Sequence, residues 1–405
     1  MKKTLVALAA LAATSVFAQS SVTIYGIADV AHVNKTHTNL NGSVAAKTSG
    51  IGEGFNAGNR IGFRGTEDLG GGMSANFVIE QGINITNGQL FSSRAAAGGQ
   101  QVDGYGAASG NMPTGAYSTA TNRQSFVGLK DSNMGEVRLG YQYTALYTVS
   151  TNSGYHLGSE QPGGDLAHGT LSNASFGGTR ANGITYISPT FSNVTATLQV
   201  GAGAGREVVE ATAPANLRGI DRNKRNSILL NYVAGPVNAS YAHTNMKIEQ
   251  TVASSLGNPT NIFGSLNATA YTAATAAAVN QNNKLDQLAG SYQLGAAKLT
   301  ASLANGKVND SVTTTNTVKT SAQQLGAEYK FGNLRPFFIT GTAVVKDSAG
   351  VKTFNGDTEQ FGVRYDLSKR TIVYAMTGSV KDKAQATATS IQERKATAFG
   401  LFHSF

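Results

Sequence analysis

The last eleven residues of the chain, KATAFGLFHSF (395–405), alternate between two faces up to the final residue. One face holds Thr397, Phe399, Leu401, His403 and Phe405, and the other holds Ala398, Gly400, Phe402 and Ser404. A period of two is the period of a β-strand. Chain ends are usually polar and frayed. A strand that stops on an aromatic residue without a turn therefore predicts neighbours that hold it on both sides.

The opposite end of the chain, MKKTLVALAALAATSVFAQS (1–20), has two lysines, then an apolar run, and then small residues that end at Ala18. This is the pattern of a secretory signal peptide, with cleavage expected after Ala18. The apolar run is too short for a membrane-spanning helix, which needs about 20 residues. We therefore expect a signal peptide over 1–18 and one exported domain over 19–405.

The composition narrows the class of protein. The chain has 405 residues, 48 glycines, no cysteine and a net charge of +9. No stretch after the signal peptide is continuously apolar, which excludes membrane-spanning helices, and the lack of cysteine excludes a disulfide framework. The basic excess is compatible with small anionic solutes or anionic lipid. A nucleic-acid partner is not expected, because the basic residues are scattered singly through an exported chain.

The exported domain contains sixteen segments that alternate with a period of two, about ten residues each. Every second connection between them is short, such as LGGG (69–72), whereas the connections between those are mostly long and polar. The segments are 22–33, 59–69, 73–85, 123–131, 135–145, 180–189, 194–205, 223–233, 237–248, 284–294, 297–308, 318–331, 334–346, 358–367, 371–382 and 393–405.

This pattern predicts an all-β fold: a 16-stranded antiparallel transmembrane β-barrel with short periplasmic turns and long extracellular loops. Strands of this length, tilted near 40°, cross the apolar band of about 25 Å. A closed barrel also explains the chain end, because the last strand pairs with the first, SVTIYGIADV (21–30). We assign Tyr25 and Phe405 to this closure and its interface. A soluble sandwich, the alternative, rarely has so many strands in one sheet.

Five stretches together resemble the trimeric general porins of Gram-negative bacteria, in the branch typical of beta-proteobacteria. They are SVTIYGIAD (21–29), NRIGFRGTEDLGGGMSANFVIE (59–80), RQSFVGLKDSNMGEVRLGYQ (123–142), NGITYISPTF (182–191) and GLFHSF (400–405). The resemblance implies three barrels per assembly and a third long loop, 146–179, folded into each pore. It also implies passive passage of small hydrophilic solutes, often with a preference for anions. Tyr141, where the family often has arginine, and His403 depart from the family pattern.

Alternation predicts which side chains line the pore. In one strand Arg60 and Arg64 alternate with apolar residues; in another, Glu136 and Arg138 alternate with Val137, Leu139, Tyr141 and Tyr143, which we place against lipid. A cation at the lipid midplane costs about 2–4 kcal/mol, so charged residues are expected to face the lumen. The alternative for each arginine is neutralisation by a neighbouring acid. The predicted pore-lining residues are Arg60, Arg64, Arg138, Arg364, Lys330, Glu80, Glu136, Glu328 and Asp366.

Two polar connections carry further charge. GSEQPGGD (158–165) in the third loop offers Glu160 and Asp165 as acids at a constriction, or as parts of an ordinary solvated loop. RGIDRNKR (218–225) gathers basic residues near an outer mouth, where they could attract anions, contact lipopolysaccharide phosphates, or simply be solvated.

No pattern predicts catalysis, a cofactor or a metal site. The six histidines lack metal-ligand spacing, and GAGAGR (201–206) lacks the third glycine of a dinucleotide loop. His243 beside Asn245 is the faint candidate for a hydrolase. We therefore predict a homotrimeric general diffusion porin of the outer membrane that prefers anions. The alternatives are a substrate-specific channel, or an adhesin or receptor acting through loops such as 86–122 and 249–283.

Overall fold

The computed structural model describes residues 21–86, 123–152, 180–202, 206–208, 219–250, 279–310, 317–384, 388 and 391–405. The predicted signal peptide (1–18) and its cleavage site at Ala18 lie outside these residues. The described residues form strands and one short helix, α2 (Ala145–Asn152). None of the described helices is long and apolar enough to cross a membrane.

The strands form one antiparallel sheet. Their bounds are β1 (Ser21–Asn39), β2 (Val44–Glu53), β3 (Arg60–Gly70), β4 (Met73–Gly82), β5 (Ser125–Asp131), β6 (Gly135–Tyr143), β7 (Arg180–Ile187), β8 (Val194–Ala202), β9 (Arg206–Val208), β10 (Gly219–Ala234), β11 (Val237–Gln250), β12 (Val279–Leu294), β13 (Ala297–Asp310), β14 (Thr317–Tyr329), β15 (Leu334–Lys346), β16 (Lys352–Asp366), β17 (Thr371–Asp382) and β18 (Ile391–Ser404).

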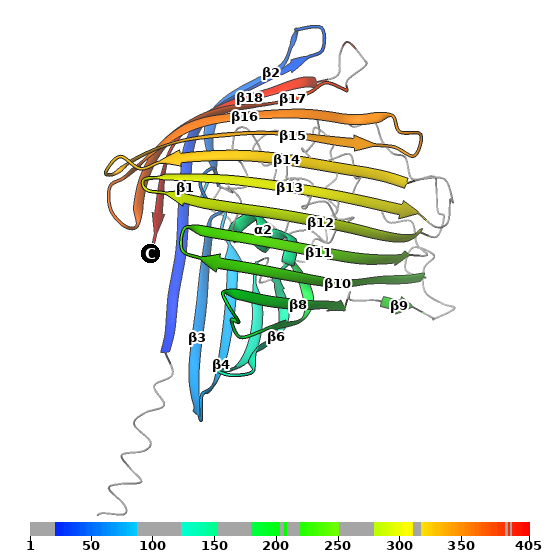
Figure 1. Cartoon of the computed structure of the whole chain (residues 1–405). Helices are drawn as coiled ribbons and strands as arrows, with labels where there is room; N and C mark the ends of the chain where they lie inside the picture. The colour runs from blue at the N-terminus through cyan, green and yellow to red at the C-terminus, as the bar shows by residue number, and fades with distance from the viewer. Residues whose placement is uncertain are drawn as a thin grey trace, which may run out of the picture.

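Sixteen of these strands make up the circumference of the barrel. The other two, β2 and β9, each pair with part of a strand edge whose remaining part pairs with a barrel strand. β3 pairs with the first part of β1, and β2 pairs with the rest of the same edge. β8 and β9 share one edge of β10 in the same way. The predicted 16-stranded antiparallel barrel is therefore confirmed, and Figure 1 shows β10–β16 as a continuous wall.

The barrel closes where the chain ends. β1 pairs with β18 from Ile27 opposite Ser404 onward, and the backbones of Gly26 and Phe405 exchange two hydrogen bonds of 3.1 Å. A Cβ atom on Gly26 would lie 2.2 Å from the Phe405 ring, so only glycine fits there. The terminal aromatic is thus held by the first strand, as the alternation predicts.

The short turns predicted from the sequence join consecutive strands at one end of the barrel, which we call the short-turn side; the opposite end is the loop side. Several strands extend further towards the loop side than predicted, because backbone pairing does not need apolar side chains. β2 lies inside the predicted loop 34–58, and β16 begins at Lys352. Most of RGIDRNKR belongs to β10, with Arg225 buried, so its prediction as a polar connection is wrong, whereas its place near an outer mouth stays a prediction.

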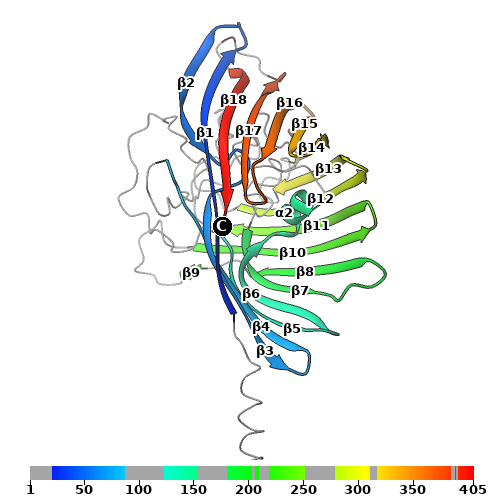
Figure 2. The ribbon, with the colours of Figure 1, turned by 90° about the vertical axis from the view of Figure 1, so that its left-hand side faces the viewer.

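The two faces of the sheet differ in the way the alternation predicts. Large apolar side chains are exposed on one face, among them Ile24, Phe63, Val137, Leu139, Leu288, Leu303, Leu325, Phe338, Phe361 and Leu401. The other face is the inner one, because helix α2 packs against it at β10, β11 and β12 (Figure 2).

Helix α2 follows directly after β6 and fixes the start of the third long connection inside the barrel. The Thr144 hydroxyl caps the helix by accepting the Tyr147 N–H at 3.2 Å. Leu146 and Val149 are fully buried against β10–β13. The Gln287 amide donates to the Ser150 hydroxyl at 2.9 Å. The first residues of the predicted inward loop therefore lie against the inner wall.

Candidate functional site

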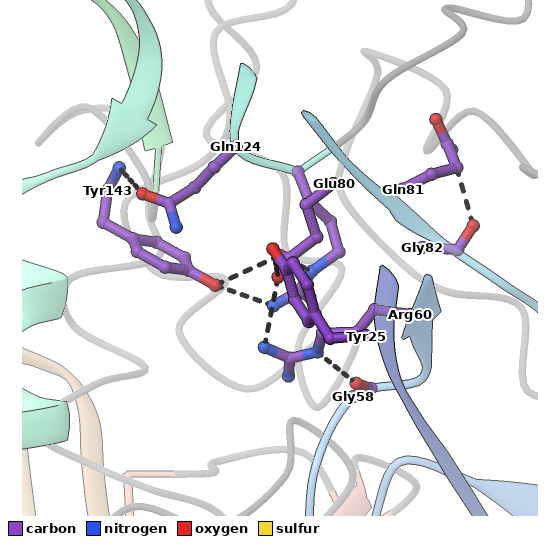
Figure 3. A network of polar contacts seen from close by, with 9 residues as sticks. Tyr25, Gly58, Arg60, Glu80, Gln81, Gly82, Gln124 and Tyr143 are labelled. Carbon is purple, nitrogen blue, oxygen red and sulfur yellow. Dashed lines mark hydrogen bonds and ion pairs between the residues drawn. The ribbon is translucent and has the colours of Figure 1, made fainter. Parts of the chain in front are cut away.

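Charged side chains from the ends of β3 and β4 and from the approach to β5 meet on the inner wall, level with Tyr25–Ile27 of β1 and next to the start of α2. Glu80 forms an ion pair with Arg123, and an Arg60 nitrogen lies 3.8 Å from its second oxygen. The Tyr25 hydroxyl donates to that same oxygen at 3.2 Å (Figure 3). We call Tyr25, Arg60, Glu80, Arg123 and Tyr143 the α2-side cluster; it contains two cations and one anion.

Tyr143 joins this cluster to the helix. Its hydroxyl, seen in Figure 3, accepts a hydrogen bond from Arg123 at 2.7 Å. Its ring stacks on that of Tyr147 with 4.6 Å between centroids. Arg180 adds a third cation, 4.9 Å from the centre of the Tyr143 ring. Burial raises the pKa of the Tyr147 hydroxyl, so that it stays neutral.

The prediction that Tyr143 faces lipid is wrong. β6 ends at this residue and Thr144 begins the turn into α2, so the strict alternation of the strand no longer applies. Gly140, with a φ of 134°, already departs from regular strand geometry three residues earlier. Alternation is a property of continuous strand, and it fails where the chain leaves the wall.

Arg64 differs from the other arginines of this region. Its guanidinium lies 5.3 Å from the centre of the Tyr25 ring, its side chain is exposed, and no acid pairs with it among the described residues. The Tyr25 ring occupies the space beside Gly62, where a Cβ atom would lie 2.3 Å from it. Tyr25, grouped with Phe405 in the sequence-based assignment, therefore belongs to the α2-side cluster rather than to the outer interface at the chain end.

A second pair of predicted residues lies on β6. Glu136 accepts two hydrogen bonds from Arg138, at 2.6 and 2.9 Å, and a third from Asn76 of β4 at 3.1 Å. The Arg138 guanidinium also lies 4.8 Å from the centre of the Phe126 ring. The guanidinium of Arg138 therefore lies against the wall, bound to Glu136 and over the Phe126 ring.

The remaining predicted residues gather at the short-turn side of β14–β16. Arg364 pairs with Glu328, and Arg335 pairs with Asp366, also lying 3.7 Å from Glu328. We call these four residues the short-turn cluster. Its two cations and two anions balance. A hollow of about 370 Å³ beside it is also lined by Lys298, Lys330 and Lys369.

Three cations in or beside these clusters, Arg335, Arg123 and Arg180, were not predicted from the sequence. Arg335 could have been found, because it alternates with Leu334 and Pro336 in NLRPFF (333–338). Arg123 and Arg180 gave no such signal: one precedes its strand and the other begins one, so no run of alternation assigns their side. Glu160 and Asp165, predicted at the constriction, lie outside the described residues.

His243, the faint hydrolase candidate, lies on the outer face. Its Nδ1 is 2.8 Å from Asp286, which also accepts the Tyr241 hydroxyl at 2.7 Å. No group of three or more histidine, cysteine, aspartate or glutamate residues suited to a metal ion occurs in the part of the chain that the structure describes.

Comparison with solved structures identifies the same architecture in known barrels. A structure described as an anion-selective porin from Comamonas acidovorans matches with a TM-score of 0.66 and 22% identity, over 96% of this chain and 100% of that one. The trimer form of OmpT, an outer membrane protein of Vibrio cholerae, matches with a TM-score of 0.60 and 14% identity, over 95% of this chain and 99% of that one. At these identities the likeness concerns the fold.

Sequence comparison extends the likeness to the family. Outer membrane porin protein 32 of Delftia acidovorans is 28% identical over 99% of this chain and 95% of its own length. An outer membrane porin protein of Bordetella pertussis is 32% identical over 39% of this chain and 47% of its own length. The family model of the Gram-negative porins matches residues 4–385. The chain therefore belongs to the Gram-negative porin family.

Proposed function

We propose that this porin is a passive general diffusion channel for small hydrophilic solutes and that it prefers anions. The observation that carries the preference is the charge of the α2-side cluster, where Arg60 and Arg123 share one acid, Glu80. A fixed positive charge raises the local concentration of anions. The structural match described as an anion-selective porin points in the same direction. The proposal includes no catalysis and no cofactor.

The proposed pore lining consists of the charged residues on the face opposite the exposed apolar residues. Arg64 is the principal candidate for a free anion-attracting charge, because it is exposed and lacks an acid partner among the described residues. Arg138 and Arg364 have acid partners, so their fields are partly cancelled. The proposed lining is Arg60, Arg64, Glu80, Glu136, Arg138, Glu328, Lys330, Arg364 and Asp366.

The proposal also covers export and assembly. The family is one of the Gram-negative outer membrane, and we propose that residues 1–18 are removed during export, so that the working protein is 19–405. We further propose a homotrimer, supported by the trimeric form of a barrel with the same fold. Outer-membrane lipid and lipopolysaccharide are the expected surroundings, and small anionic or hydrophilic solutes are the expected cargo.

The test is the reversal potential of the purified protein in a planar bilayer under a KCl gradient. We expect stepwise conductance with a reversal potential on the chloride side. Arg64→Glu should move the reversal potential towards the cation side, whereas Arg64→Lys, which keeps the charge, should leave it nearly unchanged. A cation-side value for the unmodified protein would contradict the anion preference, and a lack of conductance would contradict the channel itself.

A further inference from the structure

The connection between β2 and β3, residues 54–59, packs against the wall of the barrel. Gly54 has a φ of 78°, a left-handed conformation that turns the chain back, so that the Phe55 ring lies beside Gly52 of β2. The Phe55 side chain is 1% exposed. It belongs to a buried apolar cluster with residues of β1, β15, β17 and β18, namely Ala31, Val33, Phe337, Ile339, Tyr374, Met376 and Ala398. We call residues 54–59 the inner segment.

Alternation places this packing inside the barrel. Phe337, which packs with Phe55, alternates with Phe338, one of the exposed apolar residues of the outer face. At the other end of the inner segment, the Gly58 carbonyl accepts a hydrogen bond from the Arg60 Nε at 2.9 Å (Figure 3). A Cβ atom on Gly58 would also lie 3.5 Å from an Arg123 nitrogen. The inner segment therefore lies within the barrel and borders the α2-side cluster.

One carboxylate, that of Asp29 on β1, holds the inner segment against the wall. Its Oδ2 accepts hydrogen bonds from the backbone N–H groups of Asn56 and Ala57, at 2.7 and 2.8 Å. The Asp29 carbonyl accepts the Gly54 N–H at 3.3 Å. The other carboxylate oxygen, Oδ1, accepts the Tyr374 hydroxyl of β17 at 2.6 Å. Both oxygens of this side chain are thus occupied, one by the segment and one by the wall.

Asp29 is costly to bury, and the barrel itself does not need it. The residue is fully buried, and no ion pair joins it to a lysine or arginine among the described residues. A buried charge is tolerated only where hydrogen bonds replace its water. The backbone of β1 is already paired with β18 on one side and with β2 and β3 on the other. The contacts of the carboxylate with the inner segment are therefore what accounts for an acid at this position.

The two ends of the inner segment are fixed as well. The Asn59 amide oxygen accepts the backbone N–H of Asp29 at 2.5 Å, and its amide nitrogen donates to Glu53 at 2.8 Å. Glu53 also accepts the backbone N–H of Ile85 at 2.7 Å. Glu53 and Asn59 are both buried. The inner segment is thus attached at its start, its middle and its end, as a fixed part of the inner wall.

We propose that the inner segment forms part of the constriction of the pore and that Asp29 is the residue that positions it there. This inference rests on the proposed function, because it requires ions to pass through the barrel. Helix α2 packs against β10–β13, whereas the inner segment packs against β1, β15, β17 and β18, so the two narrow the barrel from different parts of the wall. Phe55 is buried, while Asn56, Ala57 and Gly58 are partly exposed towards the remaining space. A segment one backbone thick takes about 4.8 Å of the width, the spacing of neighbouring strands.

The first test compares three variants by single-channel conductance and by the size of poly(ethylene glycol) that enters the pore. Asp29→Ala leaves the N–H groups of Asn56 and Ala57 without an acceptor, so the inner segment should move away from the wall into water. Because the attached segment then no longer restricts the pore in one fixed place, we expect the conductance to rise about twofold and larger polymers to enter. Asp29→Asn keeps an oxygen for both N–H groups, and we expect values close to those of the unmodified protein.

Tyr374→Phe is the matched control. It removes a hydrogen bond from the same carboxylate but leaves every contact of Asp29 with the inner segment in place. We therefore expect a small loss of thermal stability and no change in conductance or polymer size. If Asp29 only joined β1 to β17, Tyr374→Phe would instead match Asp29→Ala in all three measurements.

A second test leaves Asp29 in place and examines the inner segment directly. The chain has no cysteine, so Asn56→Cys introduces a single thiol on the partly exposed side of the segment. Labelling with (2-sulfonatoethyl) methanethiosulfonate should reduce the conductance, because the added group occupies the path of the ions. The same label on Asn133→Cys, in the exposed short turn between β5 and β6, should leave the conductance unchanged.

Either of two results would overturn the inference: unchanged conductance and polymer size in Asp29→Ala with the barrel folded by circular dichroism, or full conductance after complete labelling of Asn56→Cys. The reversal potential separates this inference from the proposed function. A chloride-side reversal potential together with either of these results would contradict only the role of the inner segment. A cation-side reversal potential together with the expected rise in Asp29→Ala would contradict the anion preference and leave the role of the inner segment standing.

Discussion

Two regions of the inner wall distribute similar charges differently. In the short-turn cluster, Arg335 pairs with Asp366 and Arg364 pairs with Glu328, so that the cations and anions balance. In the α2-side cluster, two arginines share Glu80, and Arg180 lies close by over Tyr143. The four residues of the short-turn cluster thus balance within the cluster, although Lys298, Lys330 and Lys369 line the hollow beside it, whereas the α2-side cluster itself carries an excess of positive charge.

This contrast shows that the number of arginines on the inner wall is a poor guide to the field in the pore. What matters is how many acids pair with each arginine and how near the arginine lies to the path of the ions. A balanced pair contributes little field at a distance, because its two charges cancel. The imbalance beside α2 is therefore the feature from which ion preference is expected to arise.

The strongest effect should be on stability. Glu80→Gln leaves Arg60 and Arg123 largely buried without their shared anion, and breaking a buried ion pair on one side typically costs about 3–5 kcal/mol. Glu328→Gln should cost less, about 1–3 kcal/mol, because it leaves one arginine, Arg364, without its acid instead of two, while Arg335 keeps Asp366. The measurement is the free energy of unfolding in denaturant titrations of the folded barrel. Equal losses in the free energy of unfolding for the two variants would contradict the expected difference in stability between the two clusters.

The next effect concerns ion preference. The double variant Arg60→Gln/Arg123→Gln changes the charge of the α2-side cluster from +1 to −1, since only Glu80 remains charged. The double variant Arg335→Gln/Arg364→Gln removes the same two charges from the short-turn cluster. A charge about 4 Å from an ion in water contributes about 1 kcal/mol, or about fivefold in relative occupancy.

The reversal potential of each double variant under a KCl gradient distinguishes the two clusters. We expect the larger shift towards the cation side from the variant beside α2. A larger shift from the short-turn variant would mean that the ion preference is set at the short-turn mouth. Circular dichroism of both variants provides the control that the barrel is folded.

A weaker effect is expected from the loss of a single hydroxyl. Tyr25→Phe removes the hydrogen bond to Glu80 but changes no charge, and Arg60 and Arg123 still accompany the carboxylate. We expect a loss of about 1 kcal/mol in the free energy of unfolding and no change in reversal potential. A shift in ion preference without a change in charge would show that the position of Glu80, and not its charge balance, governs the pore.

The strands of the wall and the face that most of their side chains occupy could be predicted from the sequence. The ion-pair partners of those side chains could not. Alternation assigned Arg60, Glu136 and Asp366 to the face opposite the exposed apolar residues, because a strand enforces a period of two on every residue within it. It misplaced Tyr143 and gave no side for Arg123, because both lie where a strand meets a connection. At such positions the direction of a side chain depends on the path of the loop.

Three features could be derived from the order of residues alone: the number of barrel strands, the end at which short turns join them, and the closure of the last strand on the first. They follow from local periodicity and from the need to pair every strand edge in a membrane. Two others needed the folded barrel: the sharing of Glu80 by two arginines, and the separate pairs made by Glu328 and Asp366. Such pairs depend on the register between strands, which the alternation of one strand leaves open.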